Sequence, residues 1–197
     1  MNVRDVALAA TILFPLTAGS QDPPPAWVSE AREKTGLLGS QLIATLKDAL
    51  TEQGAAGGIR VCNVEAPKIA ARVSGNRFDV GRTALRIRNP DNAPDDWEES
   101  VLHRFEASMK QGADPAGLEA WQIETIVDIG GNNSDGDRVG RYMKAIPTGP
   151  QCLACHGESI APDLEATIDR LYPEDQATGF SPGDLRGAFT VTVELTD

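Results

Sequence analysis

The chain has 197 residues, of which 41% are hydrophobic and 24% are charged, and both fractions are ordinary for a globular protein. This length suits a single domain with one core. The formal net charge of −11 and the isoelectric point near 4.6 argue against binding to nucleic acid or anionic lipid, because an acidic surface repels phosphate. If the protein has a charged partner, that partner is expected to be basic.

Residues 1–20 have the pattern of a secretory signal peptide. Arg4 precedes an apolar run, Val6–Leu16, that is too short to span a bilayer, and the small residues Ala18 and Ser20 are spaced for cleavage before Gln21. An uncleaved anchor is the alternative. Because no later segment is a long uninterrupted apolar run, we expect a periplasmic location and no contact with the membrane after cleavage.

Two helices are predicted in the first half of the mature chain. The first follows a stiff proline-rich linker at residues 22–25, and it places four leucines four residues apart: Leu38, Leu42, Leu46 and Leu50. We assign residues 21–36 to the linker and the start of this helix, and residues 37–197 to the main domain. The second helix, residues 57–74, has Cys62 on its apolar face. Periodicity alone favours a buried core cysteine there, and a metal-ligating thiol is the alternative.

The segment RTALRIRN, residues 82–89, changes to a period of two and predicts a strand. Three arginines lie on one face of it: Arg82, Arg86 and Arg88. Arginine binds carboxylates through paired hydrogen bonds, so this face suits a ligand that carries carboxylates. The alternative is a solvated strand face whose arginines pair with nearby Asp and Glu residues.

A further helix is predicted to begin at Pro94, because Asp95 and Asp96 place negative charge at its positive end. Its apolar residues recur at four-residue intervals and form a stripe that faces the core: Trp97, Val101, Phe105 and Met109. At about 100° per residue, His103 points away from this stripe and is expected at the surface.

The remaining elements are predicted to be strands. Residues 121–147 contain two extended runs around a Gly/Asn/Asp-rich turn, which is typical of a hairpin. At the end of the chain, residues 187–195 alternate apolar and polar side chains. Helices that precede and flank an antiparallel sheet make an α+β domain.

The motif CLACHG, residues 152–157, has three possible meanings: a redox dithiol, half of a zinc site, or the attachment site of a c-type haem. A chain with three cysteines and two histidines lacks an evident fourth zinc ligand. A redox dithiol usually comes early in its domain. In an exported chain, the spacing favours haem c, with Cys152 and Cys155 bonded to the vinyl groups and His156 as the proximal iron ligand.

The second axial position of such an iron has four candidates, Cys62, His103, Met109 and Met143, or it is filled by water or left open. Haem also carries two propionates, for which Arg82, Arg86 and Arg88 are the candidate partners. Arg141 and Tyr142 are further candidates of no greater specificity.

Four stretches, in this order and spacing, resemble the periplasmic single-haem c-type domains with a PAS-like fold: VCNVEAPKIAARVS, GRTALRIRNPDNAPDDWEESVLHRF, QCLACHG and YPEDQATGFSPGDLRGAFTVTVEL. The resemblance runs from about Leu37 to Leu195. This family occurs as small exported proteins and as the sensing domain of histidine kinases and chemoreceptors. The resemblance implies one covalent haem on Cys152 and Cys155, with His156 proximal and Cys62 as the distal thiolate.

Two functions remain open, a redox or gas sensor and a periplasmic electron carrier. Because thiolate ligation lowers the potential of the iron, it suits a sensor better than a high-potential carrier. No kinase or methyl-accepting segment follows Asp197, so we expect the signal to pass to a separate redox or signalling protein. No second catalytic group of residues is evident, and we do not expect an enzyme.

Overall fold

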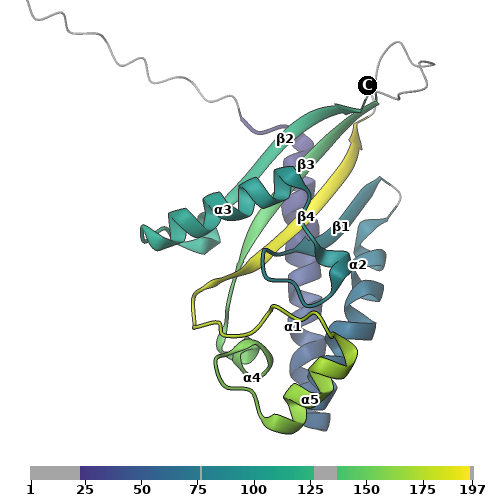
Figure 1. The fold of residues 1–197 in the computed structure, drawn as a ribbon. Coiled ribbons are helices and arrows are strands. Elements are labelled where there is room, and N and C mark those ends of the chain that lie inside the picture. Colours follow the sequence, from purple (N-terminus) through teal and green to yellow (C-terminus); the bar gives the residue numbers. More distant parts are fainter. Residues whose placement is uncertain (1–22, 76, 127–136, 196–197) are drawn as a thin grey trace, which may run out of the picture.

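The computed structural model describes residues 23–75, 77–126 and 137–195, and these residues form an antiparallel sheet flanked by helices (Figure 1). The strands are β1 (Phe78–Thr83), β2 (Glu119–Ile126), β3 (Asp137–Pro147) and β4 (Leu185–Leu195). Their spatial order is β1-β4-β3-β2, and every neighbouring pair is antiparallel. The α+β class predicted from the sequence is confirmed.

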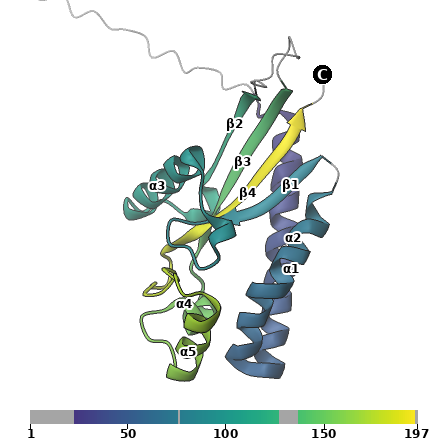
Figure 2. The same ribbon diagram turned by 45° about the vertical axis from the view of Figure 1, so that its right-hand side comes forward.

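One face of the sheet is covered by α1 (Ala26–Arg60) and α2 (Ala66–Ser74), which lie side by side in Figures 1 and 2. Gly54 interrupts α1 with a φ of 64°, a conformation that glycine adopts without steric penalty. The core on this face consists of Trp27, Val28, Ala31, Leu38, Ile69, Val73, Phe78, Val80, Tyr142, Val191 and Val193. Packing therefore begins at Trp27, before the expected domain boundary at Leu37.

The other face of the sheet is covered by α3 (Asp96–Lys110). Asp95 caps its first turn by accepting a hydrogen bond from the backbone N–H of Glu98, and the Glu98 carboxylate accepts one in return from the backbone N–H of Asp95. The apolar stripe packs as predicted, with Val101, Leu102 and Phe105 buried against the sheet. The side chain of His103 is 60% exposed, which confirms its predicted surface position.

Two strand predictions are confirmed. β2 pairs with β3 along its whole length, as the hairpin pattern indicated, and the predicted turn at 127–136 lies outside the described residues. In β4, alternation buries Val191 and Val193 against α1 and α2, and the partly buried Phe189 and Leu195 pack on the same core.

The predicted strand at residues 82–89 is wrong, because β1 ends at Thr83. Thr83 pairs with Ala188, and the next backbone N–H, that of Ala84, donates to the carbonyl of Asn92 instead of to β4. Beyond this point Leu85 packs on the core under α3, whereas Ile87 lines a cavity on the other side. The alternation of apolar and polar residues in this segment therefore reflects contacts with two different parts of the protein, and not the two faces of one strand.

The lower end of the molecule in Figure 1 is formed by α4 (Leu153–His156) and α5 (Pro162–Leu171). A small apolar cluster of Ile59, Leu164, Ile168 and Tyr172 fastens α5 to the last part of α1. Within the described ranges, none of the helices combines the length and the apolar character needed to cross a membrane. The predicted signal peptide lies outside those ranges.

Candidate cofactor site

A cavity of about 430 Å³ lies between α1, the end of β1, and the segment that contains α4. Its wall includes all three cysteines and the motif histidine, namely Cys62, Cys152, Cys155 and His156. Leucine and isoleucine side chains of α1 supply an apolar wall: Leu42, Ile43, Leu46 and Leu50. The volume is in the usual range for a bound cofactor or drug-sized ligand, about 300–1,000 Å³.

Cys62 reaches this cavity from a π-helical segment, Val61–Glu65, that joins α1 to α2. The sequence pattern predicted a helix here, but it did not predict the wider helical turn. Single π-helical turns are often found at functional sites. The Cys62 side chain is half-buried, so it is a wall residue of the cavity and not a member of the closed core.

His156 ends the short helix α4, and its ring is held in one orientation. Nδ1 lies 2.6 Å from the carbonyl oxygen of Ala177, which can only accept, so Nδ1 carries the proton and donates. Burial, together with the charges of Arg186 and Arg88, lowers the pKa of His156 to about 3. The ring is therefore neutral at physiological pH, and Nε2 keeps the lone pair that a metal ligand requires.

The three thiols are unpaired in the structure. Burial, and then the charge of Cys62, raises the pKa of Cys155, whereas a redox-active C-x-x-C motif depends on a lowered thiol pKa. Within the part of the chain that the structure describes, no three Cys, His, Asp or Glu side chains form a group that could hold a metal ion. Cys62, the motif cysteines and His156 thus line one cavity, but their side chains do not converge on a single position for a metal ion.

Arg88 lies in the cavity wall, but its guanidinium is already engaged. It forms a buried ion pair with Asp175, in which Nη2 lies 2.9 Å from Oδ2 and Nε lies 3.1 Å from Oδ1. Nη2 also donates to the backbone carbonyls of Cys155, at 2.7 Å, and of Ala177, at 3.3 Å. Ala177 is the residue whose carbonyl accepts from His156, so Arg88 fastens the motif and the support of its histidine together.

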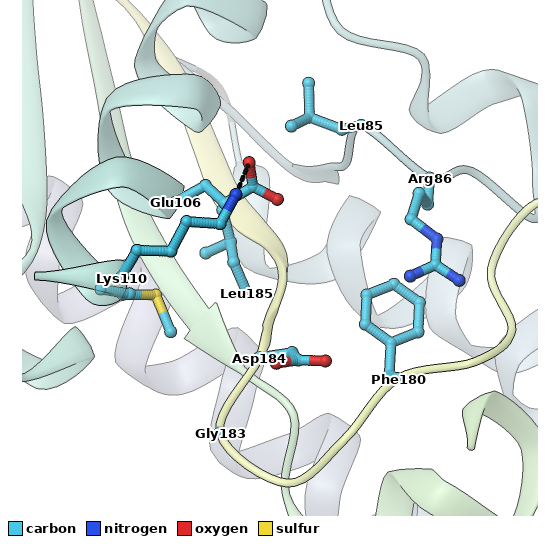
Figure 3. Close-up of a pocket in the computed structure, with 9 residues that line it drawn as sticks. Leu85, Arg86, Glu106, Lys110, Phe180, Gly183, Asp184 and Leu185 are labelled. Atoms are coloured by element: carbon cyan, nitrogen blue, oxygen red, sulfur yellow. Dashed lines mark hydrogen bonds and ion pairs between the residues drawn. The ribbon is translucent and has the colours of Figure 1, made fainter. Parts of the chain in front are cut away.

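The other two predicted arginines separate. Arg82 lines the cavity, whereas Arg86 lies outside it. Figure 3 shows Arg86 beside a second pocket, of about 360 Å³, where its guanidinium stacks over the ring of Phe180 with the carbon 4.1 Å from the ring centre. The opposite side of this pocket carries the ion pair between Lys110 and Glu106. The three arginines were expected on one face because residues 82–89 were predicted to form one strand, and that strand ends at Thr83.

The remaining sequence candidates lie elsewhere. Arg141 pairs with Asp95 at 2.6 Å, and the Tyr142 hydroxyl donates to Glu119 at 2.9 Å, so neither of these propionate candidates lines the cavity. Met143 is fully buried in the core under α3. Met109 lines the 360 Å³ pocket beside Arg86, and His103 is at the surface.

Arg186 and Tyr172 are polar residues of the cavity wall that the sequence reasoning did not consider. A signal for Tyr172 was available, since Pro162 followed by apolar residues at Leu164 and Ile168 predicts a helix that ends beside it. For Arg186 there was no such signal. It stands at the start of β4, and only the tertiary structure brings it next to the cysteines.

A sequence model of the Tll0287-like family matches residues 20–194 of this chain. One similar solved structure is described as the crystal structure of the cyanobacterial heme-protein Tll0287. The two chains are 24% identical, the superposition covers 89% of this chain and 99% of that chain, and its TM-score is 0.63. At this identity the likeness shows the fold alone. The curated proteins contain no match. Because the family model covers nearly the whole chain, this protein belongs to the Tll0287-like family.

Proposed function

We propose that this protein binds one covalent haem c, with thioether bonds to Cys152 and Cys155, His156 as the proximal iron ligand and Cys62 as the distal thiolate. The main support is the fixed imidazole of His156, whose Nδ1 is bonded to Ala177 while Nε2 remains available in a cavity that Cys62 also lines. The similar solved structure is described as a heme-protein, which supports the haem-binding part of this proposal.

The rest of the cavity suits the same group. A porphyrin is a broad apolar plate with two carboxylates, and the cavity wall includes both apolar side chains of α1 and three arginines. Ile43 is 43% exposed in the structure, and a plate lying against α1 would remove such apolar surface from water. Haem, when bound, supplies a one-electron iron couple.

The protein's own part in this chemistry is to hold and tune the iron. Ala177 and Arg88 keep His156 in one tautomer and one orientation, and Cys62 supplies a donor on a separate helical segment. A thiolate stabilises ferric iron and so lowers the potential. Such a site suits a periplasmic redox or gas sensor that passes its signal to a protein partner, and we favour this binding role over an enzymatic one. A low-potential electron carrier is the alternative.

A visible spectrum distinguishes the two roles. We expect the protein, purified from a periplasm with a c-haem maturation system, to bind carbon monoxide once reduced, because the bond from ferrous iron to a thiolate is weak. The spectrum is recorded oxidised, reduced, and reduced under carbon monoxide. A reduced iron that does not bind carbon monoxide would instead favour the electron carrier.

Cys62→Ala tests the distal ligand. The oxidised wild type should show a thiolate-to-iron charge-transfer band that disappears in Cys62→Ala, and the midpoint should rise by an amount on the order of 100 mV, since axial ligands set haem potentials over roughly 0.8 V. His103→Ala is the matched control, because that side chain is at the surface and should leave the spectrum unchanged. A wild-type spectrum of the bis-histidine type would exclude Cys62 as the ligand.

A further inference from the structure

The cavity carries an excess of positive charge that its own residues do not neutralise. Three arginines line it, Arg82, Arg88 and Arg186, and only Arg88 has a carboxylate partner, Asp175. Among the residues that the structure describes, the side chain of Arg82 makes no hydrogen bond, ion pair or ring contact. Arg186 donates to the backbone carbonyl of Arg86 at 3.3 Å and stacks on the ring of Phe180, 5.2 Å from its centre, and neither group is an anion.

This arrangement is costly unless an anion joins it. Burial lowers the pKa of Arg82, and burial together with the charges of Arg88 and Arg82 lowers the pKa of Arg186 to about 10. Buried guanidinium groups are rarely left without an acceptor or a counter-charge in folded proteins. Arg82 also borders a groove with acidic residues, including Asp91 and Asp95, but forms no ion pair with them within the described ranges.

The position of the two arginines points to the occupant of the cavity as the missing anion. Arg82 is on β1 and Arg186 on the adjacent strand β4, so both approach the cavity from the sheet, whereas the motif cysteines come from the segment around α4. Each guanidinium can bind one carboxylate of the occupant through two parallel hydrogen bonds.

We propose that Arg82 and Arg186 bind the two haem propionates at the sheet side of the cavity, and that Arg88 serves instead to fasten the C-x-x-C-H segment. This inference rests on the proposed function, since it needs a haem in the cavity. It replaces the arginine face predicted from the sequence, because Arg86 is removed from the site and Arg186 takes its place. The propionates are then held inside the protein and not in solvent.

The test is the midpoint potential of the holoprotein at fixed pH in Arg82→Gln and Arg186→Gln. Removal of a cation from the neighbourhood of the iron favours the ferric state, so each variant should shift the ferric to ferrous ratio at least tenfold toward ferric, or about 59 mV in a one-electron couple. Arg86→Gln is the matched control. It removes the same charge from an exposed side chain outside the cavity, where salt screens it, and should change the ratio by less than about threefold.

A second readout separates direct binding from a structural role. Arg186→Lys and Arg82→Lys keep the charge but lose the two-pronged geometry, so the midpoint should return toward wild type while the propionate bending band in the resonance Raman spectrum stays displaced. If a glutamine variant fails to fold, the midpoint potential and the propionate band of the corresponding lysine variant provide the test instead. Wild-type midpoints and propionate bands in the variants of both arginines would overturn the propionate assignment and leave the haem itself in place. A wild type without covalent haem would instead overturn the proposed function.

Discussion

The Cys152→Ala, Cys155→Ala double variant should contain no haem that survives acid-organic extraction, whereas the wild type should retain one haem per chain. Both thiols line the cavity together with His156, and thioether bonds are the one form of attachment that persists when the fold and the iron ligands are lost. The measurement is the haem content of denatured, extracted protein, with the mass of the intact chain as a check. Haem that extracts freely from the wild type would contradict covalent attachment.

Cys62→Ala is the matched control for this experiment. It removes a thiol from the same cavity, but from the segment Val61–Glu65 and not from the motif. Because Cys62 is assigned to the iron and not to a vinyl group, the variant should keep covalent haem in full while its spectrum changes. If Cys62→Ala also loses covalent haem, the assignment of Cys62 to the iron and of the motif cysteines to the vinyl groups is wrong.

Arg88→Ala should cost about 3–5 kcal/mol of unfolding free energy, the usual effect of removing one partner from a buried ion pair. The side chains of Arg88 and Asp175 are only 8% and 7% exposed, so the substitution leaves an uncompensated buried carboxylate. It also removes donors from the carbonyls of Cys155 and Ala177. At roughly 2–4 °C per kcal/mol for a chain of this size, the Tm should fall by about 6–20 °C.

The stability measurement has a close control in the neighbouring arginine. Arg86→Ala removes an exposed side chain whose only hydrogen bond is from Nε to the carbonyl of Gln176 within the described residues, so it should cost less than about 1 kcal/mol. The Arg88→Ala, Asp175→Ala double variant should be less destabilised than the sum of the two single variants, because no lone charge remains buried. A loss below about 1 kcal/mol in Arg88→Ala would show that the pair does not hold the motif.

Local signals were sufficient for the elements whose stabilising contacts are themselves local. The acidic pair of Asp95 and Asp96 after Pro94, together with a four-residue apolar repeat, predicted α3 and the exposure of His103. Alternation over residues 187–195 predicted most of β4, because Phe189, Val191, Val193 and Leu195 all pack on one face of a single sheet. The α+β class follows from these elements.

Alternation failed at residues 82–89, where consecutive side chains meet different neighbours. Leu85 packs under α3, Ile87 lines the cavity, and Arg88 pairs with Asp175, 87 positions away in the sequence. A period of two reports that side chains alternate between environments, but it does not report which element supplies each environment. The shared face predicted for Arg82, Arg86 and Arg88 depended on that information, and the arginines that line the cavity are instead Arg82, Arg88 and Arg186.

The sequence by itself determined the α+β class and the grouping of the motif residues, because the cysteines and the histidine of a C-x-x-C-H segment are held close together by covalent spacing. Only the tertiary structure decided that Cys62 shares a cavity with this motif, that the carbonyl of Ala177 accepts a hydrogen bond from Nδ1 of His156, and that Arg186 lines this cavity while Arg86 lies outside it. The reason is physical. Spacing along the chain controls contacts within one helical turn, whereas contacts between distant segments are set by how the helices and the sheet bury their apolar faces together.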